Sequence, residues 1–307
     1  QPGSNLIDMW WEKSHSTIGK RWRKYNKGGV YRKWYGNSIW VVDYGSYGEN
    51  ITNAGGQLTN QHLYGKKHIS WTRVSSNLNL RYYDEGVFFD NTSPAIVDNI
   101  DFLLAYFNSK VGEFNRLGKF SGTKIEAGHI RSLAPLSPEN DEMEIVNRIS
   151  NSLVELGRSD WRSYENSWDF TTLPLLDKQH RKPALKETYQ QLRAQWQQMT
   201  DDMQRLEEEN NRIFIDAYGL QDELTPEVTL KEITLTCNPH YRYGDDKTGD
   251  ELEALLLADT MRELISYAVG CMFGRYSLDK PGLILANQGD TINQYLEQIP
   301  EPSFTPD

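Results

Sequence analysis

The sequence predicts an α+β protein in which a small mixed sheet comes first, a long helix follows, and the C-terminal part is mainly helical. Three observations support this fold class. Short β-branched and aromatic runs separated by turn residues occupy the first hundred residues. An unbroken heptad pattern of apolar residues predicts a helix over about 184–218. A second long helical pattern covers 252–273.

The strands of the predicted sheet are rich in residues that favour extended backbone. The first is Ile-Trp-Val-Val at 39–42, and a Gly- and Asn-rich stretch at 45–56 follows it. Turn-forming residues then separate three further predicted strands, which cover 68–74, 78–83 and 87–90.

A single amphipathic helix over 100–114 is expected to cover this sheet, because its apolar residues recur at helical spacing. A loop at 119–129 and an extended segment at 130–138, ended by prolines, come next. A second helix is predicted for 141–157, where apolar residues are four apart.

The heptad helix carries an apolar seam from Leu185 to Ala217, with Asn210 as a single polar position that would fix the register. Such a seam predicts packing on a partner helix, in this chain or another. The alternative is one long helix that lies on its own domain.

Beyond Gly219, Thr225-Pro226-Glu227 is a helix-start pattern. The acidic, Pro-rich end is expected to be a loose tail. We divide the chain into a domain at 1–140, a helical spacer at 141–219 and a mainly helical domain at 220–307.

Composition indicates an ordinary globular protein of 307 residues, with 38% hydrophobic and 12% aromatic residues. The sequence shows neither an apolar run of membrane-spanning length nor a signal peptide, so a cytoplasmic location is expected. The net charge of -10 divides unevenly: residues 1–136 hold 17 Lys and Arg against 11 Asp and Glu. The N-terminal part is therefore the one expected to meet an anion.

The stretch at 20–37 contains seven cations and five aromatic rings but no carboxylate. Cations that neutralise phosphates beside rings that pack on sugars or bases are typical of nucleic-acid binding. A solvated basic face over core aromatics is the structural alternative. Trp34 and Tyr35 are expected to build the core.

Candidate DNA-binding residues follow from this pattern. Phosphate contacts are predicted for Lys20, Arg21, Arg23, Lys24, Lys27 and Lys33. Base contacts are predicted for Arg32, Arg73, Ser75, Asn77, Arg81 and Lys124. A surface salt bridge is the alternative for any of them, above all for Arg81, which lies close to Asp84 and Glu85 in the sequence. Further cations that would extend the surface are Lys66, Lys67 and Lys119.

Catalytic motifs are weaker. Asn238-Pro239-His240-Tyr241 is similar to the loop with which amino-methyltransferases hold a flipped base, but no Gly-rich strand-to-helix turn precedes it. It is therefore predicted to be a structural turn. Asp245-Asp246-Lys247 is the one compact arrangement suited to a metal nuclease, and it lies between glycines in a predicted loop. Cys237 and Cys271 have no metal-ligand spacing, so no catalytic residue, metal or cofactor is assigned to this chain.

Several segments resemble PglX-type adenine-specific DNA methyltransferases, the modification enzymes of BREX phage-defence systems. The run at 25–37 is similar to the pattern that opens their target-recognition region. Segments similar to their C-terminal part are 208–214, 218–220, 230–235 and 264–290. Residues 101–138 are similar to the recognition domains of type I specificity subunits.

This resemblance implies a double-stranded DNA recognition module that positions a methyltransferase domain absent from the chain. It also implies S-adenosylmethionine as the cofactor of the full-length enzyme. The partners expected are DNA, a methyltransferase domain of the same or another chain, and phage-defence proteins or phage inhibitors. The alternatives are a divergent complete methyltransferase or nuclease, and an acidic protein-interaction module of a defence complex.

Overall fold

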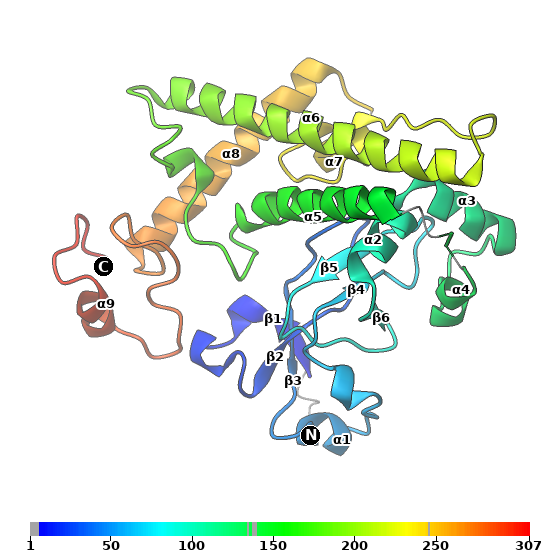
Figure 1. Ribbon diagram of the computed structural model, residues 1–307. Helices are drawn as coiled ribbons and strands as arrows, with labels where there is room; N and C mark the ends of the chain where they lie inside the picture. The colour runs from blue at the N-terminus through cyan, green and yellow to red at the C-terminus, as the bar shows by residue number, and fades with distance from the viewer. Residues whose placement is uncertain (1–5, 134, 137–139, 245) are drawn as a thin grey trace.

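The computed structural model describes residues 6–133, 135–136, 140–244 and 246–307. Strands gather at one end of the molecule, and α5 and α6 lie side by side above them (Figure 1). Helix α8 crosses α6, and α9 lies beside the C-terminus at the left-hand edge of the view. The α+β class predicted from the sequence is confirmed.

The first sheet has the order β1-β3-β2 and is antiparallel. Its strands are β1 (Ile7–Met9), β2 (Trp22–Tyr25) and β3 (Trp40–Asp43). The register places Trp22 opposite Asp43 in β3. Only β3 was predicted, because β2 lies in the basic stretch and has two cations between its buried Trp22 and Tyr25.

The second sheet has the order β5-β4-β6 and is also antiparallel. It consists of β4 (His68–Ser70), β5 (Arg81–Tyr83) and β6 (Ala95–Ile96). The first two are shorter than predicted, and β6 was not predicted. The expected strand at 87–90 does not form. Phe88 instead makes an isolated parallel bridge to Tyr25, and this bridge joins the two sheet regions.

The helix predicted over 100–114 is broken into α2 (Ile100–Asn108) and α3 (Lys110–Lys119). Ser109 has extended backbone, and its Oγ accepts a hydrogen bond from the Gly112 N–H, so it caps α3. A side chain at Gly112 would collide with the Tyr106 carbonyl, which explains the glycine. An extended segment was expected at 130–138, but its first three residues belong to the short helix α4 (Ala127–Ser132). Ala134, Ser137 and Pro138 lie outside the described residues.

The long helices α5 (Asn140–Arg162) and α6 (Leu185–Tyr218) run in opposite directions (Figure 1). The predicted heptad helix is confirmed, and the middle of its seam is buried within this chain, since Trp196 and Met203 belong to the main core. Leu185 and Ala217, at the two ends of the seam, are exposed. The amide of Asn210 donates to the Ala105 carbonyl in α2. The partner of the seam is thus supplied by this chain's own helices, chiefly α5 and α3.

The remaining helices are α1 (Glu49–Asn53), α7 (Pro239–Tyr243), α8 (Gly249–Met272) and α9 (Ile292–Gln298). No α-helix begins at Thr225, since the capping box of Thr229 starts only a short 3-10 turn at Leu230–Glu232. The expectation of a loose C-terminal tail was also wrong. The Ser303 hydroxyl donates a hydrogen bond to Asp279, and the Asp307 N–H donates to the Met272 carbonyl.

A single buried cluster runs from Trp34 in the N-terminal part through Leu153 and Met203 to Tyr276. Trp34 and Tyr35 belong to it, as predicted. Because this core crosses the positions 140 and 219, the two domain boundaries stay predictions.

Candidate nucleic-acid interface

The structure divides the predicted DNA-binding cations into an exposed group and a buried group. Arg32, Lys33 and Arg81 are 3%, 7% and 0% exposed. A side chain with so little surface cannot reach a phosphate or a base edge from this position. We therefore correct the prediction for these three residues and refer to them, with their partners, as the buried cation cluster.

Arg32 pairs with Asp160 at the end of α5, with 3.2 Å between Nη1 and Oδ2. Asp160 also accepts hydrogen bonds from the N–H groups of Thr236 and Cys237, at 2.7 and 2.9 Å. The guanidinium lies over the rings of Trp161 and Tyr241. Arg32 thus ties the basic stretch to α5 and to the segment before α7.

Lys33 pairs with Glu207 of α6, which also accepts a hydrogen bond of 2.7 Å from Trp34 Nε1. Burial alone would lower the pKa of Lys33, but the attraction of Glu207 outweighs it and raises the pKa. The lysine is therefore charged and committed to an internal ion pair.

Arg81 donates to the Tyr83 hydroxyl and to the carbonyls of Arg32 and Asn79 at 3.0–3.1 Å. Both predictions for Arg81 were wrong, since Asp84 pairs instead with Arg158 at 2.7 Å. The arginine satisfies buried backbone acceptors, which explains its complete burial.

The exposed group lines a shallow hollow beside β2, which we call the basic hollow. Its volume is about 880 Å³, and it is lined by Lys20, Arg21, Arg23, Tyr44, Gly45, Ser46, Tyr47, Glu49 and Asn50. Alternation along the strand places Arg21 and Arg23 on one face, while Trp22 points into the core beneath. This strand thus supplies one wall of the hollow, and residues 44–50 supply the other.

Arg21 is held in place at the hollow by Asp43, with hydrogen bonds of 3.0 Å from Nε and 2.6 Å from Nη2. Burial would raise the pKa of Asp43, but hydrogen bonds from Arg21 and Asn50 hold it below its usual range. Arg23 lies over the Phe88 ring and donates to the Gly19 carbonyl. Lys20 is exposed and makes no ion pair among the described residues.

The other two cations of the stretch rest on aromatic rings. The Lys24 ammonium lies 4.4 Å from the Trp168 ring and 4.0 Å from Asp169, and burial lowers its pKa. Lys27 is exposed, with its ammonium 4.4 Å from the Trp40 ring. The Lys24 side chain is thus directed toward Trp168 and Asp169, whereas Lys27 remains open to solvent.

A second group surrounds Glu126. Arg73 and Lys124 reach its carboxylate at 2.7 and 3.1 Å. Ser75 bonds to the Asn77 carbonyl within the neighbouring turn, and Lys119 donates to the Ser132 carbonyl. These cations are accessible, but one carboxylate already offsets two of them.

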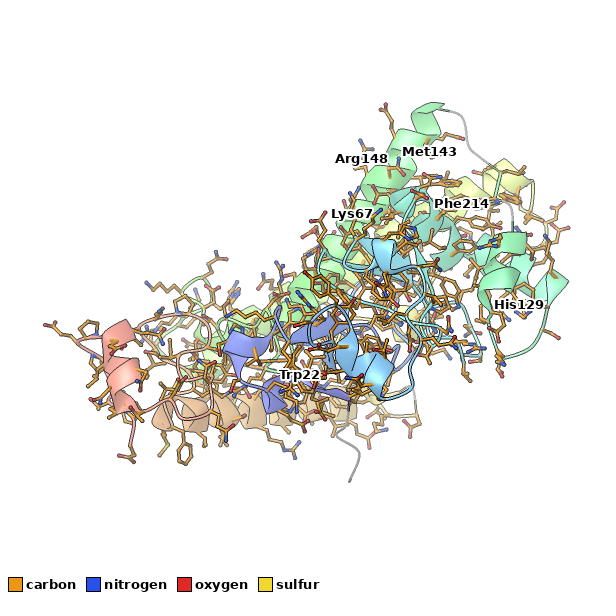
Figure 2. The ribbon with its side chains drawn as sticks, turned by 90° about the horizontal axis from the view of Figure 1, so that it is seen from below. Trp22, Lys67, His129, Met143, Arg148 and Phe214 are labelled. Carbon is orange, nitrogen blue, oxygen red and sulfur yellow. The ribbon has the colours of Figure 1, made fainter. Side chains whose placement is uncertain are left out.

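Lys66 and Lys67 are exposed on the loop before β4. Rings connect this loop to the basic hollow, because Tyr44 contacts Phe88 at 5.0 Å and Phe88 contacts Tyr64 at 5.2 Å. In Figure 2, Trp22, Lys67 and His129 lie at three separate points of the molecule, with His129 toward its right-hand edge. The ring contacts make the basic hollow and the Lys66–Lys67 loop neighbours.

The Asn238 turn is structural, as predicted. Its amide nitrogen donates to the carbonyls of Leu230 and Ile233 at 2.7 and 2.8 Å, and its oxygen accepts from the His240 N–H. Asp245 of the second motif lies outside the described residues, and Lys247 pairs with Asp246. Over the described ranges, neither a group of three potential metal ligands nor a helix able to cross a membrane is found.

Sequence reasoning missed the far wall of the hollow, which Tyr44, Tyr47 and Asn50 supply. The signal was present, since two tyrosines in a Gly-rich stretch directly follow a strand. The position of this Gly-rich stretch opposite β2 could not be predicted, because β2 itself was not predicted from the sequence.

Searched against protein-family models, the chain matches none. It is 35% identical over 302 residues to the adenine-specific methyltransferase PglX of Lacticaseibacillus casei, covering 92% of this chain and 23% of that protein. The chain is similar to a segment of PglX-type proteins.

The resemblance predicted from the motifs is thereby confirmed. The adenine-specific methyltransferase BrxX of Escherichia coli is 30% identical over 287 residues, and it too is covered over 23% of its length. The chain thus spans about a quarter of the length of these PglX-type relatives.

Proposed function

We propose that this chain is the DNA target-recognition portion of a PglX-type adenine-specific methyltransferase that serves BREX-type phage defence. The basic hollow is the observation that carries the proposal. Lys20, Arg21 and Arg23 converge there on one face, and of these three only Arg21 has a carboxylate partner among the described residues. The similarity to two adenine-specific methyltransferases supports DNA as the anion.

The hollow suits phosphate contacts rather than base reading. Arginine and lysine side chains on a strand face bind the backbone of a duplex without sequence preference. The Lys66–Lys67 loop extends the contact along the same side. Base contacts then fall to the accessible Ser75, Asn77, Arg73 and Lys124, which lie in a different region of the surface.

Methyl transfer is assigned to the part of the relatives that this chain does not match. S-adenosylmethionine would need a Gly-rich turn from a strand into a helix. Gly28-Gly29 leads into an irregular segment, and Gly55-Gly56 follows the short helix α1. The Asn238 amide is already bonded to backbone on both sides. These residues do not fit the cofactor, so no catalytic step is derived for them.

A binding titration with duplex DNA tests the proposal. The Lys20→Ser/Arg23→Gln double variant removes two charges from the hollow without unpairing Asp43. We expect it to bind about tenfold to a hundredfold more weakly than the parent at ~0.1 M salt. The matched control is Lys178→Ser/Arg181→Gln, which removes two exposed charges from the loop before α6.

Equal weakening by both variants would show a non-specific effect of net charge and would contradict the assignment of the hollow. Failure of the parent chain to bind duplex DNA at low salt would end the proposal altogether. Thermal unfolding of each variant establishes that the fold is retained.

A further inference from the structure

Tyr47 is the most exposed large side chain of the basic hollow, at 93%. It also has a φ of +53°, in the left-handed region that side chains with a Cβ rarely adopt. A bulky aromatic residue is disfavoured in this region relative to ordinary backbone. The fold therefore holds a ring in solvent in an unfavourable conformation.

The other positive-φ residues have explanations within the fold. Trp34 is buried and donates to Glu207, and the remaining non-glycine examples among the described residues are the asparagines 37, 60 and 99. Asparagine tolerates this conformation because its short side chain bonds locally. Tyr47 is exposed, and within the described part of the chain no local hydrogen bond explains its backbone conformation.

The loop that carries Tyr47 is fixed to the strand beneath it. The N–H groups of Tyr44 and Gly45 both donate to the Arg21 carbonyl, at 3.0 and 3.2 Å. The Ser46 N–H donates to the Glu49 carboxylate at 3.1 Å. Gly48 has a φ of +84°, in the left-handed region, so the turn after Tyr47 favours glycine. The ring is thus presented from a hydrogen-bonded turn that lines the same hollow as the cations.

We propose that the Tyr47 ring is a wedge that packs against a base step of the bound duplex. This inference rests on the proposed function. Cations on the floor of the hollow would bring the DNA backbone to the loop, and the ring would then meet the groove edge. Apolar side chains inserted between base steps partly unstack them, which a flat exposed ring on a rigid turn is suited to do.

Three variants separate the ring from its hydroxyl and from the charges. Tyr47→Ala should weaken duplex binding by about tenfold, the usual range for losing one base–aromatic contact. Tyr47→Phe keeps the ring and should bind within about twofold of the parent. Since Tyr47 carries no charge, the dependence of Tyr47→Ala binding on salt should match that of the parent.

A duplex with a central mismatch provides the second measurement. Unstacking is less costly at a mismatch, so the parent and Tyr47→Phe should prefer the mismatched duplex. Tyr47→Ala should lose this preference.

Each contrary result has a distinct meaning. Parent-like binding by Tyr47→Ala, with Lys20→Ser/Arg23→Gln still weakened, overturns the wedge and leaves the DNA interface in place. Weakening by Tyr47→Phe equal to that by Tyr47→Ala assigns the contact to the hydroxyl and also overturns it. If the parent does not bind DNA, both proposals fail.

Discussion

The two ends of the basic stretch contain the same residue types and have opposite environments. Lys20, Arg21 and Arg23 face a solvent-filled hollow, whereas Arg32 and Lys33 are buried against acids. The acids, Asp160 and Glu207, lie 128 and 174 residues farther along the chain. A local excess of positive charge therefore does not identify a binding surface until its distant partners are known.

The largest expected effect lies at the buried end. Arg32→Met would leave Asp160 charged and without its cation in the interior. The free energy of unfolding should fall by about 3–5 kcal/mol, measured by urea denaturation. DNA affinity of the fraction that remains folded should be nearly unchanged, in contrast to the variants of the hollow. A loss below about 1 kcal/mol would contradict the structural role assigned to Arg32.

A pH effect of similar size is expected at His68, which lies between the exposed Lys66–Lys67 loop and the core. Burial lowers the pKa of His68 to about 4. In the unfolded chain the His68 imidazole therefore takes up a proton near pH 6.5, whereas in the folded chain it takes one up only near pH 4. Stability should fall as the pH drops from about 6.5 to about 4, by up to about 3 kcal/mol.

Urea denaturation at several pH values measures this dependence. His68→Phe keeps a ring between Tyr83 and Phe89 and should flatten the pH profile in this window. The control is His15→Gln, because His15 is exposed. A profile unaltered by His68→Phe would show that other groups cause the acid loss.

A smaller effect is expected from the group around Glu126. Arg73→Gln/Lys124→Gln removes the same formal charge as the double variant of the hollow. Glu126 already offsets part of that charge, so the loss of duplex affinity should be smaller than at the hollow. Parallel titrations compare the two, and a larger loss at Glu126 would move the principal phosphate contact to that group.

The sequence predicted those elements whose signal is local and strong. The heptad pattern located α6 within a residue at its start, and apolar spacing located α8. It failed where a single side chain overrides a periodic pattern, as at Ser109, which caps a new helix inside one amphipathic run. It also failed at β2, because that strand is stabilised by pairing with β3 rather than by its own alternation.

The candidate site was predicted in part for the same reason. Residues Lys20, Arg21 and Arg23 are accessible, as a basic surface requires. The burial of Arg32, Lys33 and Arg81 depends on contacts with distant segments, which no short window of sequence contains. The Tyr47 loop depends on positive φ values that only its glycines suggest.

The salt dependence of duplex binding tests the central claim most directly. Each phosphate contact contributes about 0.9 to the slope of log affinity against log salt, so Lys20→Ser/Arg23→Gln should reduce that slope by about 2. The control Lys178→Ser/Arg181→Gln should keep the slope of the parent. An unchanged slope for the Lys20→Ser/Arg23→Gln variant, with the fold intact, would show that the hollow does not hold the DNA backbone.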